Sequence, residues 1–197
     1  HHRERYLEPD EETRLLAELP PDIRRLVEVG IHTGIRLGAL LGLHWRDVDF
    51  GREFISVPDT LSKNRKFYSV PINSRASTVL KEVGSRANHT GPDDLIFCKA
   101  DGSPRKSVRT AWKAACKRAG LNGVRFHDLR HTAASRIVMA GGTLYDVQEH
   151  LGHKTAAMAQ RYAHLSADHR RRVAELTLAN SVTYLSRVRA EREAESA

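Results

Sequence analysis

The chain has 197 residues, 40% of them hydrophobic and 28% charged, which is typical of one folded domain with a substantial core and excludes a disordered chain. Lys and Arg number 32 against 24 Asp and Glu, so the formal net charge is +8 and the pI is near 9.8. That balance favours a polyanionic partner, with nucleic acid as the first candidate.

Two further classes of protein are not expected. The two cysteines, Cys98 and Cys116, lie in different predicted elements without metal-ligand spacing, so a disulfide framework is not indicated and a reducing, intracellular setting is the default. No run reaches the ~18 apolar residues of a membrane span, and no signal peptide opens the chain.

Two helices are expected at the start of the chain. Pro9, followed by acidic residues 10–12, is typical of a helix start, and Pro20-Pro21 ends that helix. Apolar residues at helical spacing predict a second helix from about Asp22 to Thr33-Gly34. The next segment, IRLGALLGLHW, is apolar nearly all round and is expected to be buried, yet it contains Arg36. A guanidinium in such surroundings needs an anionic partner.

A small sheet is expected next. Phe54 to Val57 and Phe67 to Ile72 have the composition and alternation of strands, and Leu95 to Phe97 is expected to be a short third strand. The intervening loop, SKNRK at 62–66, carries three cations. It is either a solvated turn or a hairpin tip that enters a DNA groove.

The rest of the chain is expected to be helical. Capping and breaking residues predict helices that begin at Ser74, Val108, Asp128, Thr143 and Thr155. The helix from Thr155 is expected to carry Tyr162, and a last amphipathic helix is expected from about Ala167. Residues 1–188 are expected to form one domain, mainly α with a small antiparallel three-stranded sheet (α+β). The polar tail 189–197 is expected to fray.

The stretch from Arg125 to Tyr162 brings together cations, imidazoles and a phenol. His127 and Arg130 are three residues apart at a helix start, where the helix dipole favours an anion. With Arg36, they could hold phosphate oxygens, and the Tyr162 phenol could serve as a nucleophile. Taken singly, each residue has a commoner explanation as a solvated cation, a capping histidine or a core tyrosine.

Neither a metal nor a cofactor is expected. The histidine pairs His127 with His131 and His150 with His153 lack the carboxylate or cysteine companions of a metal site. No Gly-rich phosphate loop is present, so ATP is not indicated.

The order and spacing of these residues favour the functional interpretation. HDLRHTAASRIVMAGGTLYDVQEHLGHKTAAMAQRYAHL resembles the C-terminal active-site segment of the tyrosine recombinase family, also called the phage integrase family. TGIRLGALLGLHW resembles the family's first arginine motif, and LSKNRKFYSVPIN resembles its lysine-bearing hairpin. The resemblance runs from Ile31 to about Leu165 and implies the catalytic-domain fold of that family.

The resemblance implies a site-specific DNA recombinase that works through a covalent 3′-phosphotyrosine, without metal or ATP. The catalytic residues it implies are Arg36, Lys63, His127, Arg130, His153 and Tyr162. The two arginines would clamp the scissile phosphate, and His153 would donate a hydrogen bond to it. Lys63, or alternatively Lys66, would protonate the leaving 5′ oxygen. His127 would assist proton transfer at the nucleophile, Tyr162.

The same resemblance implies partners and a setting. Contacts with double-stranded DNA are expected from Lys63, Arg65, Lys66, Arg125 and Lys154. Further recombinase protomers are expected in a tetramer on DNA, and a monomer in isolation stays open. The expected location is cytoplasmic and nucleoid-associated, in a prokaryotic or phage-encoded setting.

Two departures from the family pattern stand out. The family has an acidic residue three places after its first arginine, where this chain has Ala39; a carboxylate from elsewhere, such as Asp47, is one substitute. The N-terminal core-binding domain of the family is also expected to be absent. Two alternatives stay open: a type IB topoisomerase-like enzyme that reseals the same strand, and a catalytically weakened DNA-binding accessory protein.

Overall fold

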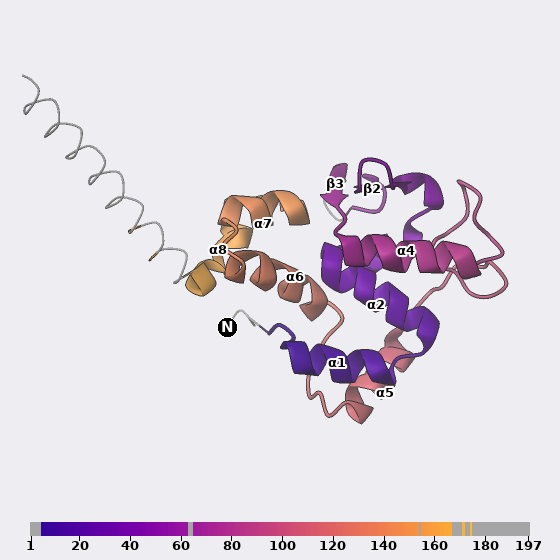
Figure 1. The fold of residues 1–197 in the computed structure, drawn as a ribbon, viewed down its shortest axis with the longest axis horizontal. Helices are drawn as coiled ribbons and strands as arrows, with labels where there is room; N and C mark the ends of the chain where they lie inside the picture. Colours follow the sequence, from indigo (N-terminus) through magenta and orange to yellow (C-terminus); the bar gives the residue numbers. More distant parts are fainter. Residues whose placement is uncertain (1–4, 63–64, 154, 167–170, 172–173, 175–197) are drawn as a thin grey trace, which may run out of the picture.

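The computed structural model describes residues 5–62, 65–153, 155–166, 171 and 174 (Figure 1). Its helices are α1 (Pro9–Glu18), α2 (Pro21–Thr33), α3 (Leu37–Gly42), α4 (Ser74–Arg86), α5 (Arg109–Arg118), α6 (Asp128–Met139), α7 (Leu144–Leu151) and α8 (Ala156–Gln160). Two 3-10 helices are η1 (Trp45–Asp47) and η2 (Ala163–Ser166). The strands are β1 (Val48–Asp49), β2 (Phe54–Val57) and β3 (Tyr68–Pro71). The predicted fold class, mainly helical with a three-stranded antiparallel sheet, is confirmed.

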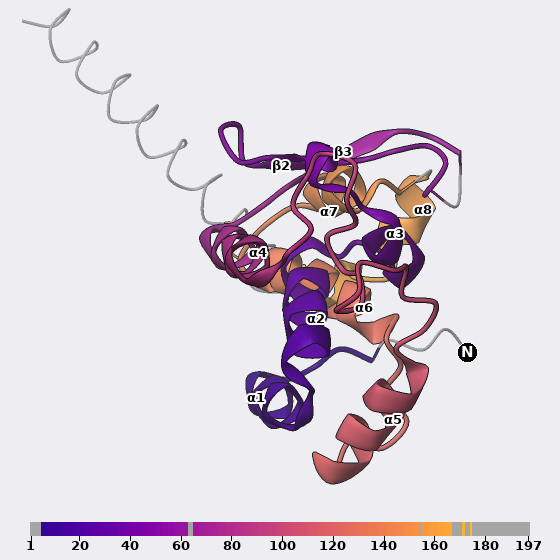
Figure 2. The ribbon, with the colours of Figure 1, turned by 90° about the vertical axis from the view of Figure 1, so that its right-hand side faces the viewer.

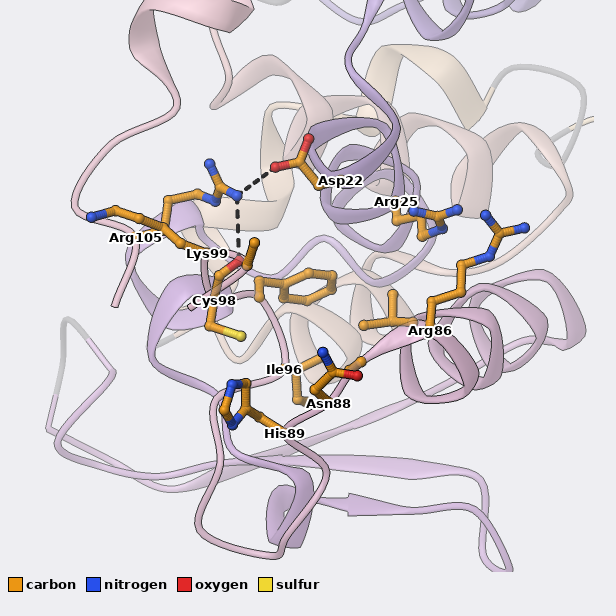
Figure 3. Close-up of a pocket in the computed structure, with 13 residues that line it drawn as sticks. Asp22, Arg25, Arg86, Asn88, His89, Ile96, Cys98, Lys99 and Arg105 are labelled. Carbon is orange, nitrogen blue, oxygen red and sulfur yellow. Dashed lines mark hydrogen bonds and ion pairs between the residues drawn. The ribbon is translucent and has the colours of Figure 1, made fainter. Parts of the chain in front are cut away.

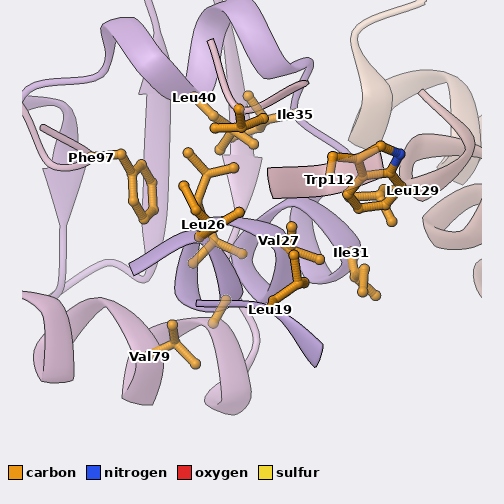
Figure 4. Packing of buried hydrophobic residues seen from close by; sticks show 14 of the residues in the cluster. Leu19, Leu26, Val27, Ile31, Ile35, Leu40, Val79, Phe97, Trp112 and Leu129 are labelled. Atoms are coloured by element: carbon orange, nitrogen blue, oxygen red, sulfur yellow. The ribbon is translucent and has the colours of Figure 1, made fainter. Parts of the chain in front are cut away.

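Helix α2 lies at the centre of the molecule, between α4 and α6 (Figures 1 and 2). Leu26 and Val27 are fully buried along it, and Figure 4 shows them among side chains from α3, α4, α5 and α6. One carboxylate, Glu28, is also buried there, and it accepts a hydrogen bond from Arg24 Nε at 3.0 Å and another from Arg75. These pairings stabilise a charge that would otherwise be costly to bury.

The strands pair antiparallel in the order β1–β2–β3, with Val48 opposite Ile55 and Ile55 opposite Val70. The two predicted strands of the hairpin are therefore confirmed. The prediction of a third strand at 95–97 was wrong, because Leu95 forms only an isolated bridge with His44. The third strand is instead β1, only two residues long, which pairs with the neighbouring β2.

Most helix boundaries follow the predicted capping chemistry. Gly34 ends α2 with φ +66°, and the Thr143 side chain accepts a hydrogen bond from the Asp146 N–H at the start of α7. The predicted cap at Ser74 was wrong: the preceding Asn73 has extended backbone angles, and its side chain accepts from Ala76 N at 2.9 Å. Within the described residues, no helix combines the length and apolar character needed to cross a membrane.

The buried side chains form two clusters. The large cluster runs from Leu7 to Leu129 and joins α1 to α5, the sheet and the start of α6. The small cluster lies between α6, α7, α8 and η2. Its buried members are Ala133, Ala134, Val138, Val147, Leu151, Ala159 and Tyr162. The predicted helix from Ala167 and the tail 189–197 lie outside the described residues, except for Arg171 and Ala174.

Candidate active site

Arg130 connects the two clusters. It lies on α6, its side chain is 4% exposed, and it donates hydrogen bonds to the Gly34 carbonyl at 2.9 Å and the Leu151 carbonyl at 2.5 Å. Burial, and then the nearby charge of Arg36, lower its pKa to about 10. The guanidinium is therefore still charged at neutral pH, and it is held in place by two neutral backbone acceptors rather than by a carboxylate.

Arg36 approaches the same place from the large cluster. It is the N-cap of α3, two residues after the left-handed turn at Gly34, and it is half-buried. None of the hydrogen bonds or ion pairs between described residues involves its guanidinium. The two guanidiniums repel each other, and that of Arg36 has no partner among the described residues, so an anion between them would be strongly stabilised.

The departure at Ala39 has a structural counterpart. The Ala39 side chain is 2% exposed, one turn after Arg36, and packs in the large cluster. The suggested substitute, Asp47, accepts a hydrogen bond from His44 N at 2.8 Å and lies 3.8 Å from His44 Nδ1. Asp47 is therefore engaged at the start of η1, and the hypothesis that it takes the place of the missing carboxylate beside Arg36 is not supported by its contacts.

His153 lies directly after α7, where Gly152 ends the helix with φ +61°. A Cβ on Gly152 would come within 2.7 Å of the Tyr68 ring, so glycine is what allows the end of α7 to pack against β3. The buried His153 Nδ1 has no hydrogen-bond partner among the described residues. Burial, and then the charges of Arg130 and Arg36, lower the pKa of His153 to about 4.

A cavity of about 460 Å³ opens beside His153, between the β2–β3 hairpin and α7. It is lined by Ser62, Lys66, Phe67, Tyr68, Ser69, Gln148, Glu149, Gly152 and His153. Lys66, the alternative to Lys63 in the sequence prediction, therefore lies at the same opening as His153. Lys63 and Lys154 lie outside the described residues, whereas Arg65 and Arg125 are both exposed.

Tyr162 lies in the turn between α8 and η2, so the prediction that it lies within the helix from Thr155 was wrong. Its side chain is 4% exposed, and its hydroxyl is 2.7 Å from His131 Nδ1. Burial, and then the charge of His127, lower the pKa of His131 to about 4. His131 is therefore neutral near pH 7, so that Nδ1 can accept a hydrogen bond from the phenol.

His127, predicted to act at the nucleophile, is the N-cap residue of α6. Its ring meets the His131 ring edge-on, with the centroids 5.2 Å apart. Burial, followed by the charges of Arg130 and Arg36, lowers its pKa. The structure thus brings Arg36, Arg130, His127, His153 and Tyr162 to one region, and it adds His131.

From the sequence, His131 stands out only as half of a possible metal-binding pair with His127. A histidine after Arg130 carries no distinctive spacing, and the residue it contacts lies 31 positions further along the chain. The described residues contain no group of three or more His, Cys, Asp or Glu side chains placed to hold a metal ion.

A second cavity of about 350 Å³ lies at a separate place, between α2, the end of α4 and the segment before α5 (Figure 3). Arg105 crosses it to donate hydrogen bonds to the Asp22 carboxylate and, at 3.3 Å, to the Cys98 carbonyl. None of the predicted site residues lines this cavity. The predicted chemistry therefore belongs to the region around Arg130.

The arrangement has known counterparts. The model of the phage integrase family matches residues 5–169. The integrase of Salmonella phage P22 is 37% identical over 175 residues, which cover 85% of this chain and 45% of that protein. Tyrosine recombinase XerC of Xanthomonas axonopodis pv. citri is 34% identical over 171 residues, covering 83% of this chain and 55% of that protein. The chain spans about half the length of these curated relatives.

Solved structures are similar as well. The catalytic domain of bacteriophage HP1 integrase is 27% identical with a TM-score of 0.61, and the match covers 86% of this chain and 93% of that one. The Tn1549 transposon integrase, in complex with circular intermediate DNA, shares the fold at 20% identity with a TM-score of 0.72, covering 90% of this chain and 68% of that one.

Proposed function

This chain belongs to the phage integrase family, and we propose that residues 1–188 are the catalytic domain of a site-specific DNA recombinase. In this proposal the domain cleaves and rejoins DNA strands through a 3′-phosphotyrosine, with no metal and no ATP. The observation that carries the proposal is the meeting of Arg130 and Arg36 beside His153 and Tyr162. Arg36 and Arg130 repel each other beside the proposed nucleophile Tyr162, so an anionic substrate bound between them would be stabilised by both.

The scissile phosphate would occupy the space that the two guanidiniums share. A phosphodiester there would replace the repulsion between Arg36 and Arg130 by two attractions, and each guanidinium can donate two charge-assisted hydrogen bonds. The unpartnered His153 Nδ1 suggests that this ring turns a nitrogen toward a non-bridging oxygen when DNA is bound. Because the attack adds charge to those oxygens, such donors stabilise the transition state more than the ground state.

Tyr162 would attack the phosphorus, form the 3′-phosphotyrosine bond and expel the 5′ oxygen of the next nucleotide. Lys63 is proposed to protonate that oxygen, and Lys66, which lines the cavity beside His153, is the alternative. His127 is proposed to assist proton transfer near the nucleophile. A 5′ hydroxyl from a partner strand would then attack the phosphotyrosine, so the reaction conserves the bond energy and needs no high-energy cofactor.

The proposed partner is double-stranded DNA, in keeping with the net charge of +8. The residues proposed to contact its backbone are Lys63, Arg65, Lys66, Arg125 and Lys154. Other protomers are proposed to join on DNA in a tetramer, as the family resemblance implies. The cytoplasm, at the nucleoid of a bacterial host, is the proposed location.

The test is covalent trapping on a nicked suicide DNA substrate that carries the recombination site, with a chelator present throughout. The wild-type chain is expected to form a protein–DNA adduct that survives denaturation, and Tyr162→Phe is expected to form none, because the attacking oxygen is gone. The Tyr145→Phe variant is the matched control, since that phenol is exposed on α7. Its adduct yield should equal that of the wild type.

The outcomes separate the alternatives. Joining of the adduct to a partner strand indicates a recombinase, whereas relaxation of supercoiled DNA without strand exchange indicates a type IB topoisomerase. DNA binding without an adduct would indicate the accessory protein that the alanine at position 39 first suggested. Loss of the adduct with chelator would contradict the metal-free mechanism.

A further inference from the structure

The nucleophile proposed above is held by a residue to which the family comparison gives no role. The Tyr162 hydroxyl lies 2.7 Å from His131 Nδ1, and both side chains are nearly inaccessible, at 4% and 7% exposed. The two rings are 5.9 Å apart between centroids, so the contact is made at the edges where the polar atoms lie. The hydrogen bond joins the first turn of α6 to the turn after α8.

The surroundings keep His131 neutral. Burial is the largest cause, and the nearby charges of His127, Arg161 and Arg130 also lower its pKa, against the opposing charge of Asp128. A neutral imidazole carries one proton, and the tautomer decides which partner donates in this contact. With that proton on Nε2, Nδ1 accepts the hydrogen bond from the phenol, and this is the tautomer that the proposal below requires.

We propose that His131 is the catalytic residue that orients the Tyr162 hydroxyl and takes its proton as the phenol attacks, a role that the sequence had given to His127. The inference rests on the proposed recombinase function and assigns one step within it. As the bond between Tyr162 Oη and phosphorus forms, the bond to the 5′ oxygen breaks. The phenolic proton passes to His131 Nδ1, and the general acid supplies a separate proton to the leaving oxygen.

The bound phosphate makes this transfer feasible. In the free protein the charges of Arg161 and Arg130 disfavour a charged His131, whereas a phosphodiester between Arg36 and Arg130 would offset part of that field. The His131 ring then takes up the proton while the negatively charged phosphate is bound beside it. In the second half of the reaction the imidazolium returns the proton to the departing phenol oxygen, as microscopic reversibility requires.

His127 is placed for a different task. Its ring packs edge-on with the His131 ring, with the centroids 5.2 Å apart. His127 is also much more exposed than His131. We therefore assign His127 to the phosphate or to proton exchange with solvent, behind the residue that touches the nucleophile.

The experiment measures single-turnover adduct formation by the whole chain on the suicide substrate, from pH 5 to 9. His131→Phe keeps the ring volume without a nitrogen, and is expected to slow cleavage by about 10²-fold or more. His131→Asn can still accept the hydrogen bond but cannot take the proton. Its rate should be at least tenfold below wild type and should keep rising with pH, where the wild-type rate levels off.

Three controls make the result specific. His127→Asn should lose less than the matched His131→Asn variant and keep the wild-type pH profile. His89→Asn, in the separate cavity, should match the wild type in rate and in thermal unfolding. A substrate whose leaving 5′ oxygen is replaced by sulfur, which needs no proton to depart, should not rescue His131→Phe. Rescue would mean that His131 protonates the leaving group, and would overturn the proposal.

Nitrogen-15 NMR of the imidazoles supplies a readout independent of turnover. In the wild-type chain His131 should show a protonated Nε2 and an Nδ1 signal that shifts in Tyr162→Phe; the absence of that shift would overturn the hydrogen bond itself. Unchanged or faster cleavage by His131→Phe, with wild-type DNA binding, would overturn the catalytic role alone. If the wild-type chain forms no adduct, the proposed recombinase function fails first and the role of His131 fails with it.

Discussion

The large and small clusters have different roles: the large cluster forms the framework, and the small cluster holds the proposed nucleophile. The large cluster contains α2, most other helices and the sheet, and it supplies the framework from which Arg36 projects. Among the described residues the small cluster has seven buried members, three of them alanines, and one of the seven is Tyr162. Apolar stabilisation scales with the side-chain area removed from water, so these seven residues contribute much less of it than the described members of the large cluster.

Arg130 shows how the two regions depend on each other. Its guanidinium donates to the Gly34 carbonyl on the large cluster's side and to the Leu151 carbonyl on the small cluster's side. The same side chain is the proposed clamp on the phosphate. The geometry of the site therefore depends on the boundary between the more stable large cluster and the less stable small cluster. Small structural changes at this boundary are expected to lower activity before they unfold the protein.

Truncating one buried leucine in each cluster should reveal the difference in stability between the two regions. Leu26 and Leu151 are both 0% exposed, one in each cluster. Leu26→Ala is expected to lower the free energy of global unfolding by about 2–5 kcal/mol, because it leaves a cavity in the large cluster. Leu151→Ala should cost less in chemical denaturation, while it raises hydrogen exchange selectively in α7. Equal losses with no selective exchange would contradict a division into two regions.

The boundary itself is tested at Gly34. A Cβ there would lie 2.3 Å from Leu151 Cδ2, and the left-handed φ of +66° disfavours any L side chain. Gly34→Ala is expected to cost about 2–3 kcal/mol and to slow adduct formation, because the turn that holds Arg130 must shift. Gly38→Ala is the matched control, since its added Cβ meets nothing within 4 Å and alanine favours the helix. It should be neutral or slightly stabilising.

The features that could be predicted from sequence are mostly local ones. Prolines, glycines and capping side chains fix the helix ends through contacts within a few residues, so α1, α2, α6 and α7 matched their predictions. At adjacent capping residues, such as Asn73 and Ser74, the choice depends on backbone angles that composition does not specify. β1 was missed because its two residues acquire their strand character only by pairing with β2.

The site shows the same division. Arg36, Arg130, His153 and Tyr162 could be proposed as site residues from the resemblance of their motifs to those of the family. The contact between His131 and Tyr162 could not, because it exists only after α6 has packed against the turn that follows α8. The sequence also could not predict that Arg130 would be fixed by two backbone carbonyls rather than a carboxylate. Such acceptors are available at every residue, and only the fold selects two of them.

Lowering the pH is expected to open the small cluster's side of the boundary before the large cluster's side. His131 and His153 have pKa values of about 4, below the usual value of 6.5. Between those two pH values the unfolded or opened chain binds more protons than the folded one. Stability therefore falls as the pH is lowered through this window, and changes little below it from this cause.

Hydrogen exchange at pH 7 and pH 4.5, corrected for intrinsic rates, measures this effect. Amides of α6 and α7 should lose more protection at the lower pH than those of α2. Of the described histidines with lowered pKa values, His32 lies on α2, and the other four lie on or beside α6 and α7: His127, His131, His150 and His153. His153→Asn removes one of these titrations and should weaken the pH dependence in α7 without removing it. Equal loss of protection in α2 and α7 would mean that acid acts on the whole fold, and that the two regions open as one.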